Sequence, residues 1–215
     1  MSSPSTMKSE QVMEICALCP VIPVLEVQRA EDAVPLAQAL LAGGLRVLEV
    51  TMRTDDALNA ISEMSTIKGA VVGAGTLRTP EDVRAAKQAG AAFGVSPGAT
   101  DSLLAACETE KLPILPGAAT ASEMMALLEK GYIAQKFFPA EASGGQAALK
   151  SLGGPLPKAK FCPTGGITPQ TAKSYLGLKN VMCVGGSWIA PKDLVASKNW
   201  KEIENRAQLT SKLKE

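Results

Sequence analysis

The amino-acid sequence predicts one α/β domain over residues 1–215, folded as a (β/α)8 TIM barrel. Two observations lead to this prediction. Short runs rich in β-branched residues alternate along the chain with amphipathic segments, and there are eight such runs. A length of 215 residues also suits a single domain with a sizeable core, so that no second domain is needed.

Each predicted strand is bounded by Gly, Pro, Ser or Thr residues, which mark turns. The predicted strands are Val21–Glu26, Val47–Thr51, Ala70–Ala74, Phe93–Ser96, Pro113–Leu115, Ile133–Phe137, Ala159–Cys162 and Val181–Val184. Strands that alternate with helices form parallel sheets, and eight repeats can close such a sheet into a barrel. A doubly wound open sheet is the alternative, less favoured because no G-x-G-x-x-G motif follows the first strand.

The predicted helices carry the expected start and stop signals. The segments 31–44, 79–90 and 120–131 open on Thr or an acidic residue and close on Gly. In the second segment, Thr79, Pro80 and Asp82 predict a capping arrangement at the start of the helix. We also expect an extra helix before about Cys19 and a helical extension after about Leu194, both added to the barrel.

The charge and hydropathy patterns exclude several kinds of partner. The chain has 22 Lys and Arg against 21 Asp and Glu, so its net charge of +1 gives no general attraction to nucleic acid or to an anionic membrane. The longest apolar stretch is interrupted by prolines and is too short to span a membrane. Because the region before it is unlike a signal peptide, we expect a cytoplasmic protein.

The histidine and cysteine content narrows the chemistry. The five cysteines are irregularly spaced and do not indicate a disulfide framework, and Cys16 and Cys19 form a single C-x-x-C pair. The chain has no histidine to complete a zinc site with that pair, and we expect no metal. Serine–histidine or cysteine–histidine catalysis is excluded for the same reason. Any reaction must use lysine, carboxylates, tyrosine, cysteine or backbone groups.

Lys136 lies inside a predicted strand that is otherwise apolar, where an ammonium group is costly unless something compensates its charge. The two-residue alternation of strands puts Glu49 and Arg53 on one face of the second strand. If these faces point inward, an amine, a carboxylate and a guanidinium share one cavity. Burial there favours the neutral amine, which can attack a carbonyl carbon. The alternatives are a structural ion pair of Lys136 with Glu49 or Glu141, or a lysine side chain that reaches solvent at the end of the strand.

Glycine-rich turns follow the last two predicted strands, with the sequences PTGGIT at 163–168 and GGSW at 185–188. Barrel enzymes often bind phosphate there on backbone N–H groups, although plain tight turns have the same composition. Arg53, with Thr76 as a second donor, is suited to a small carboxylate. The residues together indicate a substrate with a ketone or carboxylate near Lys136 and a phosphate near Gly166 and Ser187. Lys136 would then be a Schiff-base nucleophile.

These motifs, in this order, closely resemble those of the 2-keto-3-deoxy-6-phosphogluconate (KDPG) and 4-hydroxy-2-oxoglutarate (KHG) aldolases. The matching segments are VLEVTMRT, VGAGT, VSPG, KFFPAEASGG, FCPTGGI and CVGGSW, within about Val21 to Val195. The resemblance implies a homotrimeric class I aldolase that needs neither metal nor cofactor. Its substrate would be a small phosphorylated keto acid, KDPG, cleaved to pyruvate and glyceraldehyde 3-phosphate. KHG, cleaved to pyruvate and glyoxylate, is a second candidate substrate.

The resemblance also implies roles for individual residues. Lys136 in K-F-F-P-A would form the Schiff base, and Glu49 in L-E-V-T would shuttle protons. Arg53 and Thr76 would bind the carboxylate end of pyruvate. The other substrate contacts would be Pro97, Phe138, Thr164, Gly165, Gly166, Gly185, Gly186 and Ser187.

Two other functions fit the residues without the resemblance. A phosphate-binding isomerase would use Glu49 as a base on a sugar phosphate and Lys136 only for its charge. A sugar-acid sensor on the same scaffold would bind a phosphorylated ligand without turnover. Neither would form a covalent adduct with pyruvate.

Overall fold

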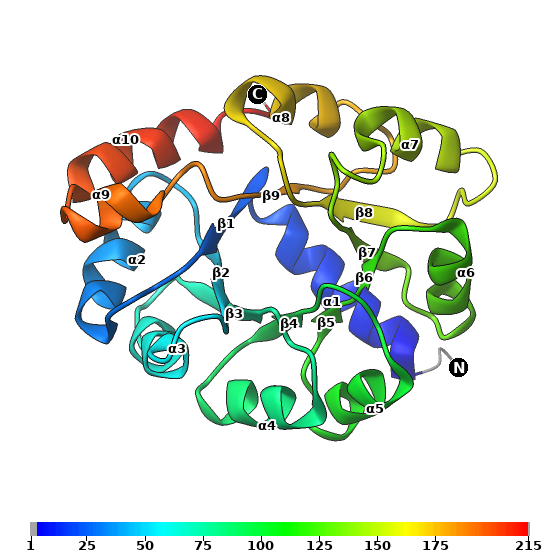
Figure 1. Cartoon of the computed structure of the whole chain (residues 1–215), viewed down its shortest axis with the longest axis horizontal. Coiled ribbons are helices and arrows are strands. Elements are labelled where there is room, and N and C mark those ends of the chain that lie inside the picture. Colours follow the sequence, from blue (N-terminus) through cyan, green and yellow to red (C-terminus); the bar gives the residue numbers. More distant parts are fainter. Residues whose placement is uncertain (1–3, 215) are drawn as a thin grey trace.

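The computed structural model describes residues 4–214, which form an α/β fold with strands inside and helices outside (Figure 1). The predicted domain limits at residues 1 and 215 lie outside the described residues. The helices are α1 Pro4–Ala17, α2 Ala33–Ala42, α3 Ala57–Ser65, α4 Pro80–Gln88, α5 Asp101–Thr109, α6 Ala121–Glu129, α7 Gly145–Leu152, α8 Pro169–Leu176, α9 Lys192–Ala196 and α10 Trp200–Ser211. The strands are β1 Val21–Leu25, β2 Val47–Thr51, β3 Val71–Gly75, β4 Phe93–Val95, β5 Ile114–Leu115, β6 Gly117–Ala118, β7 Ala134–Phe137, β8 Lys160–Pro163 and β9 Val184–Gly186.

The strands pair in parallel. Within the described residues, a curved sheet of six strands has the order β5-β4-β3-β2-β1-β9, and a sheet of three has the order β6-β7-β8. Isolated parallel bridges from Phe161 to Val181 and from Thr164 to Gly185 connect the two sheets. Because the first strand pairs with both the second and the last, the order lacks the reversal of a doubly wound sheet.

Seven of the eight predicted strands agree with the structure to within one residue at each end. The fifth is followed by a short strand that the prediction lacks, β6, because Pro116 has no N–H to donate and interrupts the ladder. The carbonyl of Pro116 still accepts the N–H of Lys136 at 2.8 Å, so β5 and β6 follow one extended segment.

The eighth predicted strand is wrong in its position. It was expected at Val181–Val184, whereas β9 covers Val184–Gly186. Two glycines in this segment weaken a strand prediction. In the structure they pair with Ile22 and Pro23 of β1, so the neighbouring strand fixes the hydrogen-bonded segment.

Threonine caps start several of the helices that follow strands. Thr79 and Asp82 form the predicted capping box of α4, with both backbone-to-side-chain distances at 3.2 Å. Thr120 and Glu123 form another at α6, where the N–H groups of Ala119 and Thr120 lower the pKa of the Glu123 carboxyl. These caps fix where each loop ends and its helix begins.

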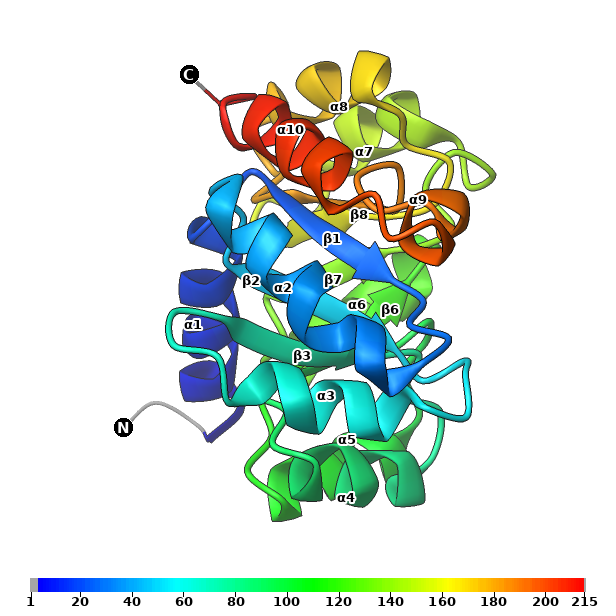
Figure 2. The same cartoon turned by 90° about the vertical axis from the view of Figure 1, so that its left-hand side faces the viewer.

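Helices are present in both terminal regions where extra helices were expected. Figure 2 shows α1 at one end of the molecule, across the amino ends of the strands, and α9 at the opposite end. The Ser9 hydroxyl donates to the carbonyl of Gly131 and accepts the N–H of Ile133, both at 3.1 Å, which ties α1 to the start of β7. The carboxyl ends of the strands therefore remain open to solvent on the face of α9.

The packing of α10 on α2 explains one glycine. A Cβ atom at Gly43 would overlap Ala207 and lie 2.6 Å from the carbonyl oxygen of Glu204.

No helix within residues 4–214 has the length and apolar character to cross a membrane.

Candidate active site

Lys136 and Glu49 lie together near the carboxyl ends of β7 and β2. The Lys136 Nζ is 3.4 Å from Glu49 Oε1, and the two side chains are only 7% and 4% exposed. The neighbouring register partners of Lys136 are Gly117 on β6 and Cys162 on β8. The ammonium nitrogen also lies 5.0 Å from the centre of the Phe138 ring, a favourable distance for a cation over an aromatic face. The predicted inward orientation of both residues is thus present.

Glycine on the neighbouring strand β3 makes room for the Glu49 carboxylate. A Cβ atom at Gly75 would overlap Oε1 of Glu49 and lie 2.8 Å from its Cγ. The next residue, Thr76, has a φ of 64°, a left-handed conformation that costs a β-branched residue about 1–3 kcal/mol. Strain of this kind is retained mainly at functional sites. The structure therefore puts Thr76, a predicted substrate contact, directly after the residue that packs on Glu49.

The loop after β7 and the loop after β8 pack on each other. The N–H of Ala140 donates to the carbonyl of Thr164 at 2.8 Å, and the N–H of Glu141 donates to that of Gly165 at 3.1 Å. Gly165 and Gly166 have φ values of 103° and 80°, which favour glycine. A Cβ at Gly165 would lie 3.4 Å from the ring of Phe138. Gly165 thus lies beside the ring that Lys136 faces, whereas a Cβ at Gly166 would overlap the side chain of Glu141.

Glu141 is held by a tyrosine that the sequence did not indicate. The Tyr175 hydroxyl donates to Glu141 Oε1 at 2.5 Å, and burial together with this carboxylate raises the pKa of Tyr175. The partner of Lys136 is therefore Glu49 rather than Glu141, the other carboxylate that was considered.

The glycines of β9 lie against bulky neighbours. A Cβ at Gly185 would overlap the Thr164 side chain, and one at Gly186 would overlap the Trp188 ring. Thr164 is buried, whereas Ser187, the next predicted contact, is exposed. Pro97 is also exposed, and its backbone occupies the space that a Cβ at Gly117 would need.

Arg53 forms an ion pair with Glu26, a residue not predicted to belong to the site. Its Nη1 lies 3.1 Å from Glu26 Oε1, and Lys192 Nζ lies 2.5 Å from Oε2 of the same carboxylate. All three residues line a cavity of about 370 Å³ together with Ser187 and Trp188. Glu26 directly follows the first strand, as other polar residues follow theirs, and this position is the signal that could have identified it. Lys192 has no such signal, because only the fold brings α9 to β1.

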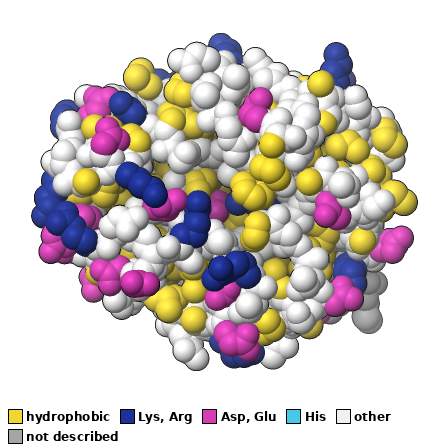
Figure 3. Space-filling model, viewed as in Figure 1, with side chains coloured by type: hydrophobic (Ala, Val, Ile, Leu, Met, Phe, Trp, Pro, Cys, Tyr) yellow, Lys and Arg dark blue, Asp and Glu magenta, His cyan; other side chains and the backbone are white. Residues whose placement is uncertain are grey.

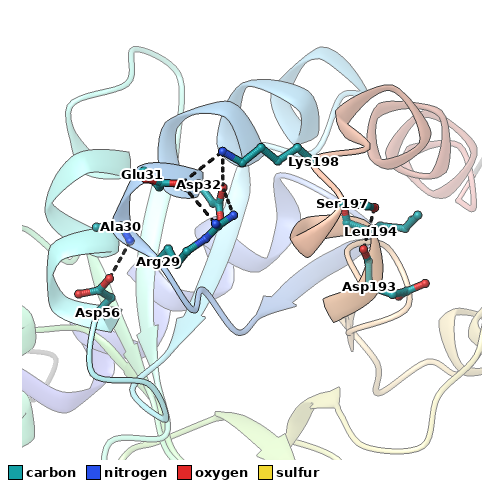
Figure 4. A network of polar contacts seen from close by, with 9 residues as sticks. All are labelled: Arg29, Ala30, Glu31, Asp32, Asp56, Asp193, Leu194, Ser197 and Lys198. Carbon is teal, nitrogen blue, oxygen red and sulfur yellow. Dashed lines mark hydrogen bonds and ion pairs between the residues drawn. The ribbon is translucent and has the colours of Figure 1, made fainter.

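A polar network fixes the loops beside this cavity (Figure 4). Arg29 forms two hydrogen bonds to the buried Asp32, at 2.9 and 3.2 Å. Lys198, which follows α9, bonds to Glu31 at 3.2 Å, and the N–H of Ala30 donates to Asp56 at 2.9 Å. The loop after β1 is thereby joined to the α9 segment and to the loop after β2.

The thiols lie in the core, and one of them, Cys162, is on the strand next to Lys136. Cys16, Cys19, Cys162 and Cys183 are all buried. Burial raises the pKa of the Cys19 thiol to about 12, which makes it a poor nucleophile or metal ligand. Within residues 4–214 there is no group of three or more Cys, Asp or Glu residues placed to hold a metal ion.

On the face that carries the carboxyl ends of the strands, Lys, Arg, Asp and Glu side chains surround a central hollow (Figure 3). A buried lysine in contact with a buried carboxylate, on parallel strands that open to this face, fits a lyase that binds carbonyl substrates covalently through a lysine amine. That class of protein is the class I aldolases.

The comparisons with known proteins specify the family. A family model described as "Aldolase: KDPG and KHG aldolase" matches residues 12–206, and the chain belongs to this family. It is 48% identical to the 2-dehydro-3-deoxy-phosphogluconate aldolase of Pseudoalteromonas atlantica, over 88% of each chain. It is 46% identical to the KHG/KDPG aldolase of Escherichia coli K12, over 88% of this chain and 89% of that one.

Solved structures give the same result. The chain resembles the KDPG aldolase of Legionella pneumophila, captured with pyruvate as a covalent carbinolamine, with a TM-score of 0.90, 44% identity and 98% coverage of both chains. It resembles the KDPG aldolase of Zymomonas mobilis with 3-phosphoglycerate equally well, with a TM-score of 0.90 and 44% identity over 95% of this chain and 97% of that one.

Proposed function

We propose that this protein cleaves KDPG to pyruvate and glyceraldehyde 3-phosphate through a Schiff base on Lys136, and that it cleaves KHG to pyruvate and glyoxylate by the same steps. The observation that supports this most directly is the buried contact of Lys136 Nζ with Glu49 Oε1 at 3.4 Å. Relatives named for KDPG, and one named for both substrates, support the choice of substrate.

The first half of the reaction needs an amine and a proton shuttle in contact. The neutral Lys136 amine adds to the C2 carbonyl carbon, and a proton passes from the nitrogen to the carbonyl oxygen to give a carbinolamine. The protonated form of Glu49, adjacent to the nitrogen, delivers a proton to the hydroxyl, which leaves as water and yields the iminium. Glu49 is then a carboxylate that can accept the next proton.

The second half uses the iminium as an electron acceptor. Glu49 removes the C4 hydroxyl proton, the C3–C4 bond breaks, and its electron pair forms the pyruvate enamine while the aldehyde leaves. Protonation at C3 and addition of water then release pyruvate and restore the Lys136 amine. One carboxylate can serve every step, since each proton transfer reverses the previous one.

The remaining predicted residues bind the two ends of the substrate in this proposal. Arg53 and Thr76 contact the pyruvate carboxylate, and Pro97 and Phe138 line the cavity. The backbone at Gly165, Gly166 and Gly186 approaches the other end, where Ser187 donates to the phosphate. Gly185 leaves space for the side chain of Thr164, which supports the same turn.

The two sheets are connected in a way that closes them into one barrel in this proposal. We infer that the eight βα units form a (β/α)8 barrel, because β9 pairs with β1 and the bridge from Thr164 to Gly185 joins the two sheets.

We further propose a homotrimer in the cytoplasm. Exposed apolar side chains, such as Met125 at 51% and Leu209 at 74%, support an assembly, and size-exclusion chromatography with light scattering tests it. Buried thiols support a reducing compartment.

Trapping with borohydride tests the mechanism. The protein is reduced with and without pyruvate, and its intact mass and peptides are measured. We expect a pyruvate-sized adduct on Lys136, absent from Lys136→Ala. Lys160→Ala is the matched control, since Lys160 lies on the adjacent strand with its amine bonded to the carbonyl of Lys179. A folded protein without an adduct would exclude the aldolase mechanism and favour the isomerase or sensor.

A further inference from the structure

The carboxylate of Glu26 lies between two cations that line the same cavity as Ser187. One oxygen pairs with Arg53 at 3.1 Å and the other with Lys192 at 2.5 Å. The Glu26 side chain is only 21% exposed, whereas those of Arg53 and Lys192 are 50% and 69% exposed. The cations therefore face the solvent, and the carboxylate lies behind them.

These charges belong to one cavity, which also contains the exposed residue Ser187. Two cations and one carboxylate give it a net charge of one positive unit. A second cavity of about 140 Å³ is adjacent, because Glu26 and Lys192 line both. The ion pair therefore borders two cavities, and its exposed cations are the groups that an anion from solvent meets first.

The fold fixes the chain segments that carry Glu26 and Lys192. Glu26 directly follows β1, and Lys192 begins α9 after Pro191. The network of Figure 4 fixes the segments on either side, since Lys198 after α9 bonds to Glu31 and Arg29 holds the buried Asp32. The amine of Lys192 is therefore kept near the cavity even though most of its side chain is exposed.

We propose that Lys192 and Glu26 are opposing determinants of specificity for the anionic tail of the substrate. Lys192 contacts the anion that enters beside Ser187, and Glu26 weakens that contact because its carboxylate pairs with the Lys192 amine. This inference rests on the proposed function for the position of the substrate's phosphate. A doubly charged phosphate responds to the charge of the cavity more strongly than a singly charged carboxylate does. The two side chains therefore set how strongly the site prefers phosphorylated keto acids.

The experiment compares wild type with Glu26→Gln, Glu26→Asp and Lys192→Met. The first readout is the dissociation constant of inorganic phosphate, measured by calorimetry on the protein without substrate. The second is KM for KDPG and for KHG. Lys201→Met is the control, because Lys201 is 73% exposed and also pairs with a carboxylate, Glu204, at 3.0 Å.

We expect Glu26→Gln to bind phosphate about threefold to tenfold more tightly and Lys192→Met to bind it more weakly by a similar factor. Glu26→Asp, which keeps the charge, should stay near wild type, and so should the control. The KM for KDPG should follow the same order, with smaller changes for KHG. These differences should shrink at about 0.5 M salt, where exposed charges are screened.

Equal phosphate dissociation constants in wild type, Glu26→Gln and Lys192→Met would overturn the inference, as would an equal effect of Lys201→Met. Failure of the proposed function would look different. In that case wild type would form no pyruvate adduct and turn over neither keto acid, while the order of phosphate affinities would still decide whether these residues control the anion site.

Discussion

Two lysine–carboxylate contacts in this protein differ mainly in their exposure to water. Lys136 and Glu49 form one contact at 3.4 Å with almost no exposed surface, whereas Lys192 and Glu26 form a shorter one at 2.5 Å at the rim. The shorter pair is the weaker candidate for chemistry. Water solvates both of its charged groups, so the interaction between them is weak and the lysine is not held in a dry cavity.

Burial gives the longer contact its chemical value. In a dry site, two such groups interact more strongly than they would in water, and their contact brings a proton donor and an acceptor together. Lys136 and Glu49 are therefore placed to exchange a proton during a reaction. The exposed pair instead contributes a field that acts on a passing anion and is weakened by salt.

We expect the largest effect from substitutions that remove the Lys136 amine from the buried contact. Lys136→Ala should lower kcat for KDPG cleavage by about 10⁴-fold or more, since no Schiff base can form. Lys136→Arg should be equally inactive, because a guanidinium stays protonated. Pyruvate release measured with a coupled dehydrogenase checks both. Activity above about 1% of wild type in either variant would remove Lys136 from covalent catalysis.

The next largest effect is expected from a substitution that removes the Glu49 carboxylate from the contact. Glu49→Gln keeps the shape of the side chain and removes its ability to take up protons, so kcat should fall by about 10² to 10⁴-fold with substrate still bound. Steady-state kinetics with KDPG measure this. An unchanged kcat would assign the proton shuttle to another group.

The stability of the folded protein sharpens the comparison. Lys136→Met leaves the Glu49 carboxylate buried without a partner and should lower the free energy of unfolding by about 3 kcal/mol. Lys192→Met should change it by less than about 1 kcal/mol, since its partner remains accessible to water. Urea denaturation followed by circular dichroism measures both. Similar losses would mean that exposure does not distinguish the two pairs.

The smallest effect is expected from a substitution at Gly75, which lies beside the Glu49 carboxylate. Gly75→Ala places a methyl group where Glu49 Oε1 now lies, so the carboxylate must shift away from Lys136. We expect kcat to fall about tenfold, because small displacements of a proton donor are costly. Gly98→Ala is the control, since nothing lies within 4 Å of a Cβ built at Gly98. Equal kcat values in the two variants would contradict this dependence on position.

Much of the strand pattern was predicted from sequence because it depends on local composition. The run Val47–Thr51 was predicted with the same limits that β2 has in the structure. The position of β9 was wrong because glycines are poor strand formers by themselves, and its pairing is imposed by Ile22 and Pro23. The break at Pro116 likewise depends on whether a neighbouring strand needs an N–H at that position, which proline cannot donate.

The candidate site also contains features that the sequence predicted and features that it did not. Residue type and position at strand ends were enough to select Lys136 and Glu49, and the structure brings them into contact. The ion pair of Arg53 with Glu26 was not foreseen, and neither was the contact of Tyr175 with Glu141. Each joins segments that are distant along the chain, and nothing in their local sequence encodes the partner.

The sequence by itself determined the alternation of strands and helices, the absence of histidine chemistry and the identity of the buried lysine. These follow from side-chain chemistry and short-range periodicity, which every residue carries with it. The tertiary structure alone decided which carboxylate meets that lysine, how Glu26 and Lys192 divide the charge at the mouth, and which glycines must lack a side chain. Those features depend on distances between chain segments, and such distances are fixed only when the strands have paired and the core has packed.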